Sequence, residues 1–242
     1  MFATERELPA PGDAGRREYV RSMFTAIAPR YDLLNHLLSL NVDRGWRRRA
    51  VEALGWQGSS GGSYLDLCAG TLDLAAALGN APGFHGLVVG ADFVHPMLVR
   101  GRGKSPRVLA LAADALVLPF PARSFDGATV GFGVRNLTDL DAGLREAARV
   151  LRPGARLVVL EFSASARQPF RGLFSFYFRR VVPAIGRIVS KHRTAYTYLP
   201  ESVEQFPAPS ELSARMERAG FGDVEFRLLT GGICALHRGI RV

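Results

Sequence analysis

The chain of 242 residues contains little cysteine, which limits both metal binding and disulfide bonding. Its two cysteines, Cys68 and Cys234, stand apart from each other and from any cysteine–histidine cluster. Metal sites in proteins are built from such clusters, so no metal is expected. We interpret the cysteines as free thiols of a protein kept in the reducing cytoplasm, although the sequence leaves a disulfide between them open.

Long apolar runs of the kind that enter a membrane are also missing. One stretch of eighteen residues, 74–91, carries no charged side chain, but it contains Gly79 and Pro82. A membrane-spanning helix needs about 20 consecutive apolar residues, so this stretch predicts a helix, a turn and a strand instead. Residues 1–18 mix acids with proline and glycine and lack the apolar core of a signal peptide. We expect a soluble or peripheral protein.

Acidic side chains are absent from one whole segment, and lysine is scarce throughout. The chain has 31 basic and 22 acidic residues, a formal charge of +9, and only two of the basic residues are lysines. Residues 164–193 contain seven basic side chains and no acid. Such an excess predicts an anionic partner, which is either a nucleic acid or a charged surface.

The remaining pattern is an alternation of short strands and helices. Alternation at this spacing predicts a parallel sheet with helices on both faces. Two late runs around Thr230-Gly231-Gly232 predict a closing hairpin, and helical spacing over residues 18–54, interrupted by Pro29, predicts two or three helices. Strands are expected at 63–68, 86–92, 107–113, 125–132, 156–162, 224–229 and 233–237, and helices at 74–78, 94–101 and 140–151.

A nucleoside-shaped site is predicted where the first three strands end, because ligands of open parallel sheets bind beyond the carboxyl ends of the strands. The small-residue turn at 66–73 allows the backbone to approach a ligand closely. Asp92 ends the second strand and can accept hydrogen bonds from both hydroxyls of a ribose. Asp114 and Ala115 end the third strand and suit the amino edge and flat face of adenine. Each feature alone has a structural explanation, such as a helix cap, but the three together favour a cofactor site.

The type of cofactor follows from a missing motif. The G-x-G-x-x-G fingerprint of dinucleotide sites is absent, which disfavours a nicotinamide enzyme. S-adenosylmethionine needs ribose and adenine contacts but no phosphate cradle, so it fits the pattern better. Within the turn, Asp66, Gly70, Thr71 and Asp73 are the candidate binding residues.

Seven segments spread along the chain carry a resemblance to one known family. They are PRYDLLN at 29–35, LDLCAGT at 65–71, DALVLPFP at 114–121, GFGVRN at 131–136, LEFS at 160–163, YLPES at 198–202 and TGGICALHRG at 230–239. On these segments the chain resembles the ubiquinone/menaquinone biosynthesis C-methyltransferases over about residues 21–238. The resemblance implies a Rossmann-like class I methyltransferase with S-adenosylmethionine as cofactor. Its α/β fold would have a seven-stranded, mostly parallel sheet with the last strand antiparallel.

The resemblance also implies roles for individual residues. The family's turn usually has the sequence Gly-Gly-Thr-Gly-Asp, whereas this chain has Ala69 and Leu72 in place of two glycines. Glycine at the position of Leu72 would permit a positive φ or a close approach of the cofactor. Cofactor contacts are implied at Thr71, Asp92, Asp114, Ala115 and Gly131, and substrate contacts at Tyr31, Arg135 and Asn136.

The activity implied is the C-methylation of a polyprenylated demethylmenaquinol to menaquinol, or the equivalent step of ubiquinone biosynthesis, or both. In this hypothesis Arg135 stabilises a phenolate, Asn136 orients it and Tyr31 bridges a water. The alternative is that Arg135 forms a structural ion pair and Tyr31 packs a helix. His237, at the end of an apolar strand, is a weaker candidate for the general base and better suited to a structural role.

The domain organisation follows the same resemblance. Residues 1–56 are expected to form an arm and a helical cap, and residues 57–242 the methyltransferase domain with an aromatic and basic helical insert at 164–205. That insert is either a buried helix or a cover for the polyprenyl tail, whose arginines would contact anionic lipids at the inner face of the cell membrane. A nucleic-acid methyltransferase is disfavoured because no base-reading motif is found, so no nucleic-acid partner is expected. An inactive cofactor-binding module and a homo-oligomer remain open.

Overall fold

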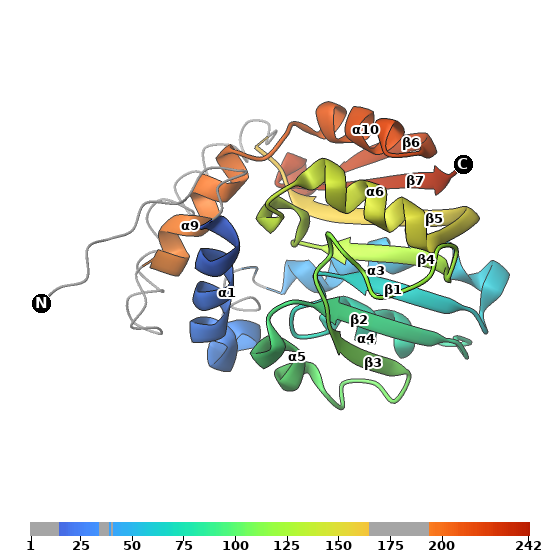
Figure 1. The fold of residues 1–242 in the computed structure, drawn as a ribbon, viewed down its shortest axis with the longest axis horizontal. Helices are drawn as coiled ribbons and strands as arrows, with labels where there is room; N and C mark the ends of the chain where they lie inside the picture. The colour runs from blue at the N-terminus through green and yellow to red at the C-terminus, as the bar shows by residue number, and fades with distance from the viewer. Residues whose placement is uncertain (1–14, 34–38, 40, 165–193) are drawn as a thin grey trace, which may run out of the picture.

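The computed structural model describes residues 15–33, 39, 41–164 and 194–242, and its centre is a seven-stranded sheet (Figure 1). The strand order is β3-β2-β1-β4-β5-β7-β6, and only β7 runs antiparallel to its neighbours β5 and β6. This confirms the predicted mostly parallel sheet and its closing hairpin. The strands are β1 (Ser63–Leu67), β2 (Leu87–Asp92), β3 (Val108–Ala112), β4 (Phe125–Gly131), β5 (Leu151–Phe162), β6 (Phe221–Leu229) and β7 (Cys234–Arg241).

Helices cover both faces of the sheet because each has one apolar stripe to bury. On one face α3 (Val42–Leu54), α4 (Asp73–Gly79) and α5 (His95–Gly101) pack in one apolar cluster with side chains of β1, β2 and β5. On the other face lie α6 (Leu140–Val150) and α10 (Pro209–Arg218), which share a second cluster with β1, β4 and β5. The side chain of Asp139 caps α6 by accepting a hydrogen bond from the backbone N–H of Ala142.

Two further helices lie across the end of the sheet where the parallel strands terminate, at the left of Figure 1. They are α1 (Arg16–Ile27), which continues into η1 (Ala28–Arg30), and α9 (Thr194–Glu204). Tyr198 of α9 is buried against Val20 and Met23 of α1, which joins the two helices. In the described part of segment 1–56, which the sequence assigns to an arm and a cap, α1 and η1 lie over this edge, whereas α3 packs on the face of the sheet.

The structure differs from the predicted elements in the fifth strand. The helix ends at Val150, one residue before the expected end, and the strand begins at once, at Leu151 rather than at Arg156. Pro153 and Gly154 lie inside it, where the pairing with β4 shifts register. Proline has no N–H to donate and Gly154 has a φ of +83°, so this part of β5 is irregular rather than a loop. Residues 165–193, most of the expected helical insert at 164–205, lie outside the described residues.

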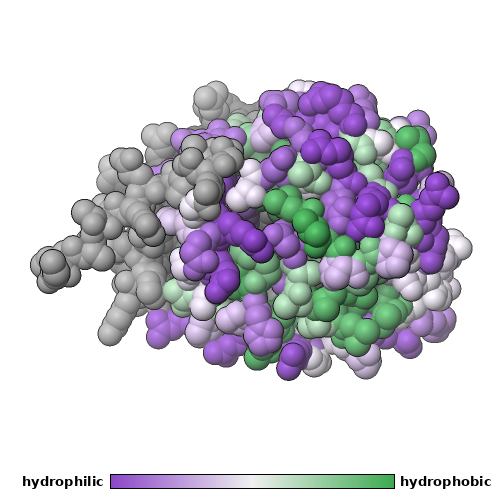
Figure 2. All heavy atoms as spheres, in the orientation of Figure 1, coloured by the Kyte–Doolittle hydropathy of each residue, from purple (hydrophilic) through white to green (hydrophobic). Residues whose placement is uncertain are grey.

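The surface carries one apolar area on the face seen in Figure 2, over β3 and the segment after it. Leu109 and Val117 are exposed large apolar side chains of this part of the chain. None of the helices among the described residues is long and apolar enough to span a membrane. The same residues contain no cluster of three or more His, Cys, Asp or Glu side chains able to hold a metal.

Candidate functional site

Two adjoining cavities lie at the carboxyl ends of β1, β2 and β4, and we call them together the cleft. The first, of about 610 Å³, opens to solvent between the turn after β1 and helix α1. The second, of about 390 Å³, extends toward the end of β3. The side chains that line both are Cys68, Asp92, Phe93, Asn136 and Leu137.

The turn after β1 has an unusual backbone for its sequence. Cys68, Gly70 and Leu72 have φ values of +50°, +53° and +63°, in the left-handed region that favours glycine. The side chain of Leu72 is buried among α4 and α5 and does not line the cleft. A Cβ atom at Gly90 or Gly101 would overlap with it. The leucine that replaces the family's glycine therefore points away from the cleft, into space that these two glycines leave.

Asp66 lies beneath this turn and does not line the cleft. One carboxylate oxygen accepts a hydrogen bond from Thr129 Oγ1 at 2.8 Å, and the other accepts one from the backbone N–H of Ala75 at 3.0 Å. Burial raises the pKa of Asp66 to about 7, although these hydrogen bonds and the charge of Arg47 act in the opposite direction. Asp66 thus ties β1 to β4 and to the first turn of α4.

Asp92, at the end of β2, joins the cleft to the same turn. Its Oδ2 accepts a hydrogen bond from the backbone N–H of Gly70 at 2.8 Å, and its Oδ1 accepts one from Val94 at 2.7 Å. Each carboxylate oxygen keeps a lone pair for a ligand hydroxyl. Burial raises the pKa of Asp92, and the two backbone hydrogen bonds oppose this effect.

The two predicted residues after β3 line the second cavity. Asp114 accepts a hydrogen bond from the backbone N–H of Leu116 at 2.9 Å, and its carboxylate faces the N-terminal end of α1. There its other oxygen lies 3.0 Å from a guanidinium nitrogen of Arg17. Ala115 lines the same cavity and offers a small apolar surface beside the carboxylate.

A network of charges that sequence reasoning missed connects the turn to the cap. Lys104, after α5, places its ammonium 2.6 Å from Asp73 Oδ1 and 2.7 Å from Asp32 Oδ2. The hydroxyl of Thr71 donates to the other oxygen of Asp32 at 2.5 Å. Arg47 of α3 approaches Asp73 Oδ2 at 3.5 Å. Asp32 lies next to Tyr31 in one of the recognised segments, and Lys104 is one of only two lysines, but nothing in the sequence pairs them.

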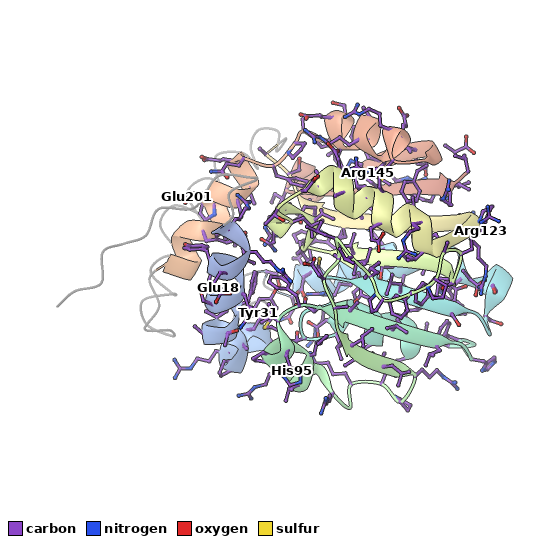
Figure 3. The ribbon with its side chains drawn as sticks, viewed as in Figure 1. Glu18, Tyr31, His95, Arg123, Arg145 and Glu201 are labelled. Atoms are coloured by element: carbon purple, nitrogen blue, oxygen red, sulfur yellow. The ribbon has the colours of Figure 1, made fainter. Side chains whose placement is uncertain are left out.

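Tyr31, Gly131 and Asn136 all line the first cavity, as the sequence predicts for residues of one site. Tyr31 lies between α1 and α5, packed against Phe24 at 5.9 Å between ring centroids (Figure 3). Asn136 ends the short helix η3 (Val134–Asn136), and its Oδ1 accepts a hydrogen bond from the hydroxyl of Tyr198 at 2.5 Å. Tyr198 itself is buried and was not among the predicted site residues.

Arg135 points away from the cleft. Its guanidinium donates to Glu161 Oε1 and to the carbonyl oxygen of Phe132, both at 2.6 Å. Burial alone would lower the pKa of Arg135, but the Glu161 carboxylate raises it above its usual value, so the guanidinium stays charged. Arg135 lines a different cavity of about 1100 Å³, the side cavity, which meets the cleft at Leu137.

His237 lies apart from the cleft. It is buried on β7, with Nε2 2.9 Å from the carbonyl oxygen of Pro209 and its ring stacked on Phe226 at 5.3 Å between centroids. Burial lowers the pKa of His237, and the contact with Pro209 opposes this effect only in part. Its position between β7 and α10 is that of a structural side chain.

The model of the ubiE/COQ5 methyltransferase family matches residues 13–241. The chain belongs to this family. Members similar to it include the demethylmenaquinone methyltransferase of Thermus thermophilus, which is 50% identical over 90% of this chain and 100% of its own length. The demethylmenaquinone methyltransferase of Deinococcus radiodurans is 46% identical over 98% of both chains. The Geobacter sulfurreducens protein named ubiquinone/menaquinone biosynthesis C-methyltransferase UbiE is 44% identical over 92% of this chain and 88% of its own.

Several solved structures have the same fold as this chain. A SAM-dependent methyltransferase of Thermotoga maritima superimposes with a TM-score of 0.63 at 19% identity, covering 91% of this chain and 99% of that chain. Another, from Aquifex aeolicus, gives a TM-score of 0.55 at 18% identity over 75% and 82% of the chains. The fold is that of the Rossmann-like class I methyltransferases, as the sequence predicts.

S-adenosylmethionine is the cofactor of this methyltransferase, and the cleft has groups that fit it. Oδ2 of Asp73, a residue of the cleft wall, is buried and makes no hydrogen bond among the described residues, although a guanidinium nitrogen of Arg47 lies 3.5 Å away. An ammonium group at this place would satisfy that oxygen. The free lone pairs of Asp92 match the hydroxyls of a ribose, and the Asp114–Ala115 corner matches an adenine.

Proposed function

We propose that this protein transfers a methyl group from S-adenosylmethionine to a ring carbon of a polyprenylated demethylmenaquinol, giving menaquinol. The observation that carries the proposal is the 50% identity to the Thermus thermophilus demethylmenaquinone methyltransferase over the whole length of that protein. The Geobacter relatives, whose names include both ubiquinone and menaquinone, support the equivalent step of ubiquinone biosynthesis as the second candidate.

The cofactor is proposed to lie along the cleft from Asp73 to Asp114. Asp73 would bind the amino group, Asp92 the ribose, and Asp114 with Ala115 the adenine. Gly70, Thr71 and Gly131 would form the walls, with Asp66 holding the turn from below. When bound, S-adenosylmethionine supplies a methyl group on a positively charged sulfur, which needs no further activation.

The protein's own task is then to make the ring carbon electron-rich and to hold it in line. Loss of the phenolic proton moves electron density onto the neighbouring ring carbon, which would take the methyl group and then lose its ring proton to restore the aromatic ring. A group that stabilises the phenolate oxygen therefore speeds the reaction. We propose Asn136 for this contact, because its amide lies in the cleft. Tyr31, which lines the same cavity, would hold a water that carries the proton away.

Arg135 would act from the side cavity through its fixed positive charge rather than from within the cleft. Its Nε is buried and has no acceptor among the described residues, while NH1 is engaged by Glu161. The wall it shares with Leu137 and Phe206 is partly apolar. The side cavity thus combines a polar N–H with apolar side chains. This combination would suit the hydroxyl edge of a hydroquinone, or a bound water, next to an isoprenoid tail.

We also propose that the protein touches an anionic membrane, where such a substrate resides. Support comes from the sequence, since residues 164–193 combine seven basic side chains with several aromatics and no acid. Amphipathic basic segments bind at the headgroup layer and are released by salt. Co-sedimentation with phosphatidylglycerol vesicles at low salt, lost at high salt, is the expected result. Equal binding to neutral vesicles would contradict the electrostatic contact.

The test of the function is a methyl-transfer assay with isotopically labelled S-adenosylmethionine and two quinols. Label is expected in menaquinol when demethylmenaquinol is the substrate, with less in the benzoquinol precursor of ubiquinone. A higher kcat/KM for the benzoquinol would move the protein to ubiquinone biosynthesis. Cofactor binding by calorimetry without transfer to either quinol would overturn the proposed activity.

A further inference from the structure

The contact that carries a further inference joins Tyr198 to Asn136. Tyr198 belongs to α9, is only 2% exposed, and donates its hydroxyl hydrogen to Asn136 Oδ1 at 2.5 Å. The two residues lie 62 positions apart in the chain. Through this one buried hydroxyl, helix α9 contacts a residue that lines the cleft.

The hydrogen bonds around Asn136 decide which way its amide faces. Nδ2 lies 3.4 Å from the carbonyl oxygen of Phe132 and donates to it, while Oδ1 accepts from Tyr198. Reversing the amide would replace this weak hydrogen bond by a contact between two acceptor oxygens, Oδ1 and that of Phe132. It would also leave the tyrosine hydroxyl to accept instead of donate. The observed orientation is the one in which all three groups are matched.

This orientation leaves a donor for the cleft. The NH2 group carries two hydrogens, and the long contact with Phe132 uses at most one of them. The amide lines both cavities of the cleft. Because Oδ1 accepts from Tyr198, the NH2 group of Asn136 is turned so that it can offer a ligand an N–H.

The surroundings keep Tyr198 protonated, so that it stays a donor. Burial raises the pKa of Tyr198 above its usual value, while the guanidiniums of Arg135 and Arg16 oppose this and the charge of Glu161 adds to it. Its ring is fixed by packing on Val20 and Met23 and by Tyr19, whose ring centroid lies 6.0 Å away. A rigid ring with a permanent hydrogen is suited to holding another side chain in one rotamer.

We propose that Tyr198 is a positioning residue for methyl transfer, which locks the side-chain amide of Asn136 so that its NH2 donates to the developing phenolate oxygen of the quinol. This rests on the proposed function for the identity of the substrate, but the amide orientation does not depend on it. Asn136 is then the group that meets the substrate, and Tyr198 acts only through it. Because Tyr198 also joins α9 to α1, the donor is aligned only when the two cap helices are docked.

The experiment compares Tyr198→Phe with Tyr19→Phe, a neighbouring ring of the same cluster that does not line the cleft. Tyr198→Phe removes one hydroxyl and keeps the packing, so kcat for demethylmenaquinol should fall on the order of tenfold. The Kd for S-adenosylmethionine should stay within about twofold of the wild-type value. Tyr19→Phe should leave kcat unchanged. A wild-type kcat in Tyr198→Phe, or an equal loss in both variants, would overturn the positioning role.

A second pair of variants tests the donor itself. Asn136→Asp replaces the NH2 by a second oxygen, so its activity relative to wild type should rise as pH falls, because a protonated carboxyl regains a donor. Tyr198→Phe added to Asn136→Asp should cost less than it costs alone, since the amide it positions is gone. Full additivity of the two losses, or a flat activity ratio across pH, would contradict the proposal.

A measurement without substrate separates this inference from the proposed function. The side-chain NH2 resonances of Asn136, assigned by their loss in Asn136→Asp, should be sharp and distinct in the wild-type protein. They should broaden or shift in Tyr198→Phe and stay unchanged in Tyr19→Phe. If the wild-type protein fails to methylate demethylmenaquinol but shows this pattern, the function is wrong and the positioning stands. Unchanged resonances in Tyr198→Phe overturn the positioning whatever the substrate.

Discussion

The ammonium nitrogen of Lys104 lies 2.6 Å from Oδ1 of Asp73, the first residue of α4 at the edge of the cleft. The same ammonium lies 2.7 Å from Asp32, which belongs to the cap. A single cation therefore holds together two carboxylates from segments that are far apart in the chain. The chain uses arginine for all but two of its 31 basic residues, so a lysine here is unusual for this sequence. The lysine ammonium is a compact charge that fits between the two carboxylate oxygens, whereas the planar guanidinium of an arginine is larger.

Lys104→Met should weaken cofactor binding. Two partly buried carboxylates would lose their shared cation and repel each other, which moves Asp32 and the cap away from the turn. We expect the Kd for S-adenosylmethionine to rise about tenfold, as for the loss of one charged hydrogen-bond network. Calorimetry measures this directly. Arg102→Met, which removes an exposed cation from the same turn, is the control for overall charge. Equal effects of the two substitutions would reject the specific link.

Leu72→Gly should destabilise the protein although it gives the turn the family's usual glycine. Glycine adopts the positive φ of this position without strain, which should stabilise the folded protein by about 1–2 kcal/mol. Loss of a buried leucine side chain costs about 2–5 kcal/mol, so the net change in the free energy of unfolding is a loss. Urea unfolding measures it, and the Kd for S-adenosylmethionine should hardly change because the side chain lies outside the cleft.

The control for Leu72→Gly uses the glycine that makes room for the leucine. Gly90→Ala alone should be destabilising, because its Cβ would overlap with Leu72. In the Leu72→Gly background the same change should cost less, by about 1 kcal/mol or more. A more stable Leu72→Gly variant, or strict additivity with Gly90→Ala, would show that the leucine is not packed as described.

Asp66→Asn should change how stability depends on pH. The pKa of Asp66 is about 7 in the folded protein and its ordinary value is 3.8, so the folded state holds the proton more tightly. Asp66 therefore favours folding at low pH, and this contribution is lost as pH rises from about 4 to 7. Asparagine can still accept from Ala75 and can donate to the Thr129 hydroxyl, which reverses that hydrogen bond, and it does not titrate. Relative to wild type, Asp66→Asn should gain about 2–3 kcal/mol between pH 5 and pH 8 in urea unfolding. A constant difference across that range would refute the raised pKa.

Arg135→Ala should cost about 3–5 kcal/mol of stability, because it leaves Glu161 buried without its cation. Glu161→Gln added to it removes the stranded charge and should recover most of the loss, as seen by thermal unfolding. The double variant then isolates the catalytic part of Arg135, since its fold is restored. Turnover of demethylmenaquinol equal to wild type in that variant would remove Arg135 from the mechanism.

The sequence predicted the sheet well because strand, turn and helix patterns are local. Asp92 and Asp114 were placed at one edge of the sheet from their positions after apolar runs, and both line the cleft. The boundary that failed is the start of β5, because Leu151 already pairs with Phe125 of β4, while Pro153 and Gly154 lie unpaired at the register shift before Arg156. Pairing between strands is a tertiary effect, and it overrode the local preference there.

By itself the sequence determined the order of elements, the edge at which ligands bind and the residue types that line it, because parallel strands end at the same edge. Only the tertiary structure decided the partners across that edge. Lys104 meets Asp32 over 72 positions and Tyr198 meets Asn136 over 62, through the docking of α1 and α9 on the sheet. The direction of Leu72 and of Arg135 was decided in the same way, by the space left by Gly90 and by the charge of Glu161. Such contacts depend on packing between distant segments, which no local pattern encodes.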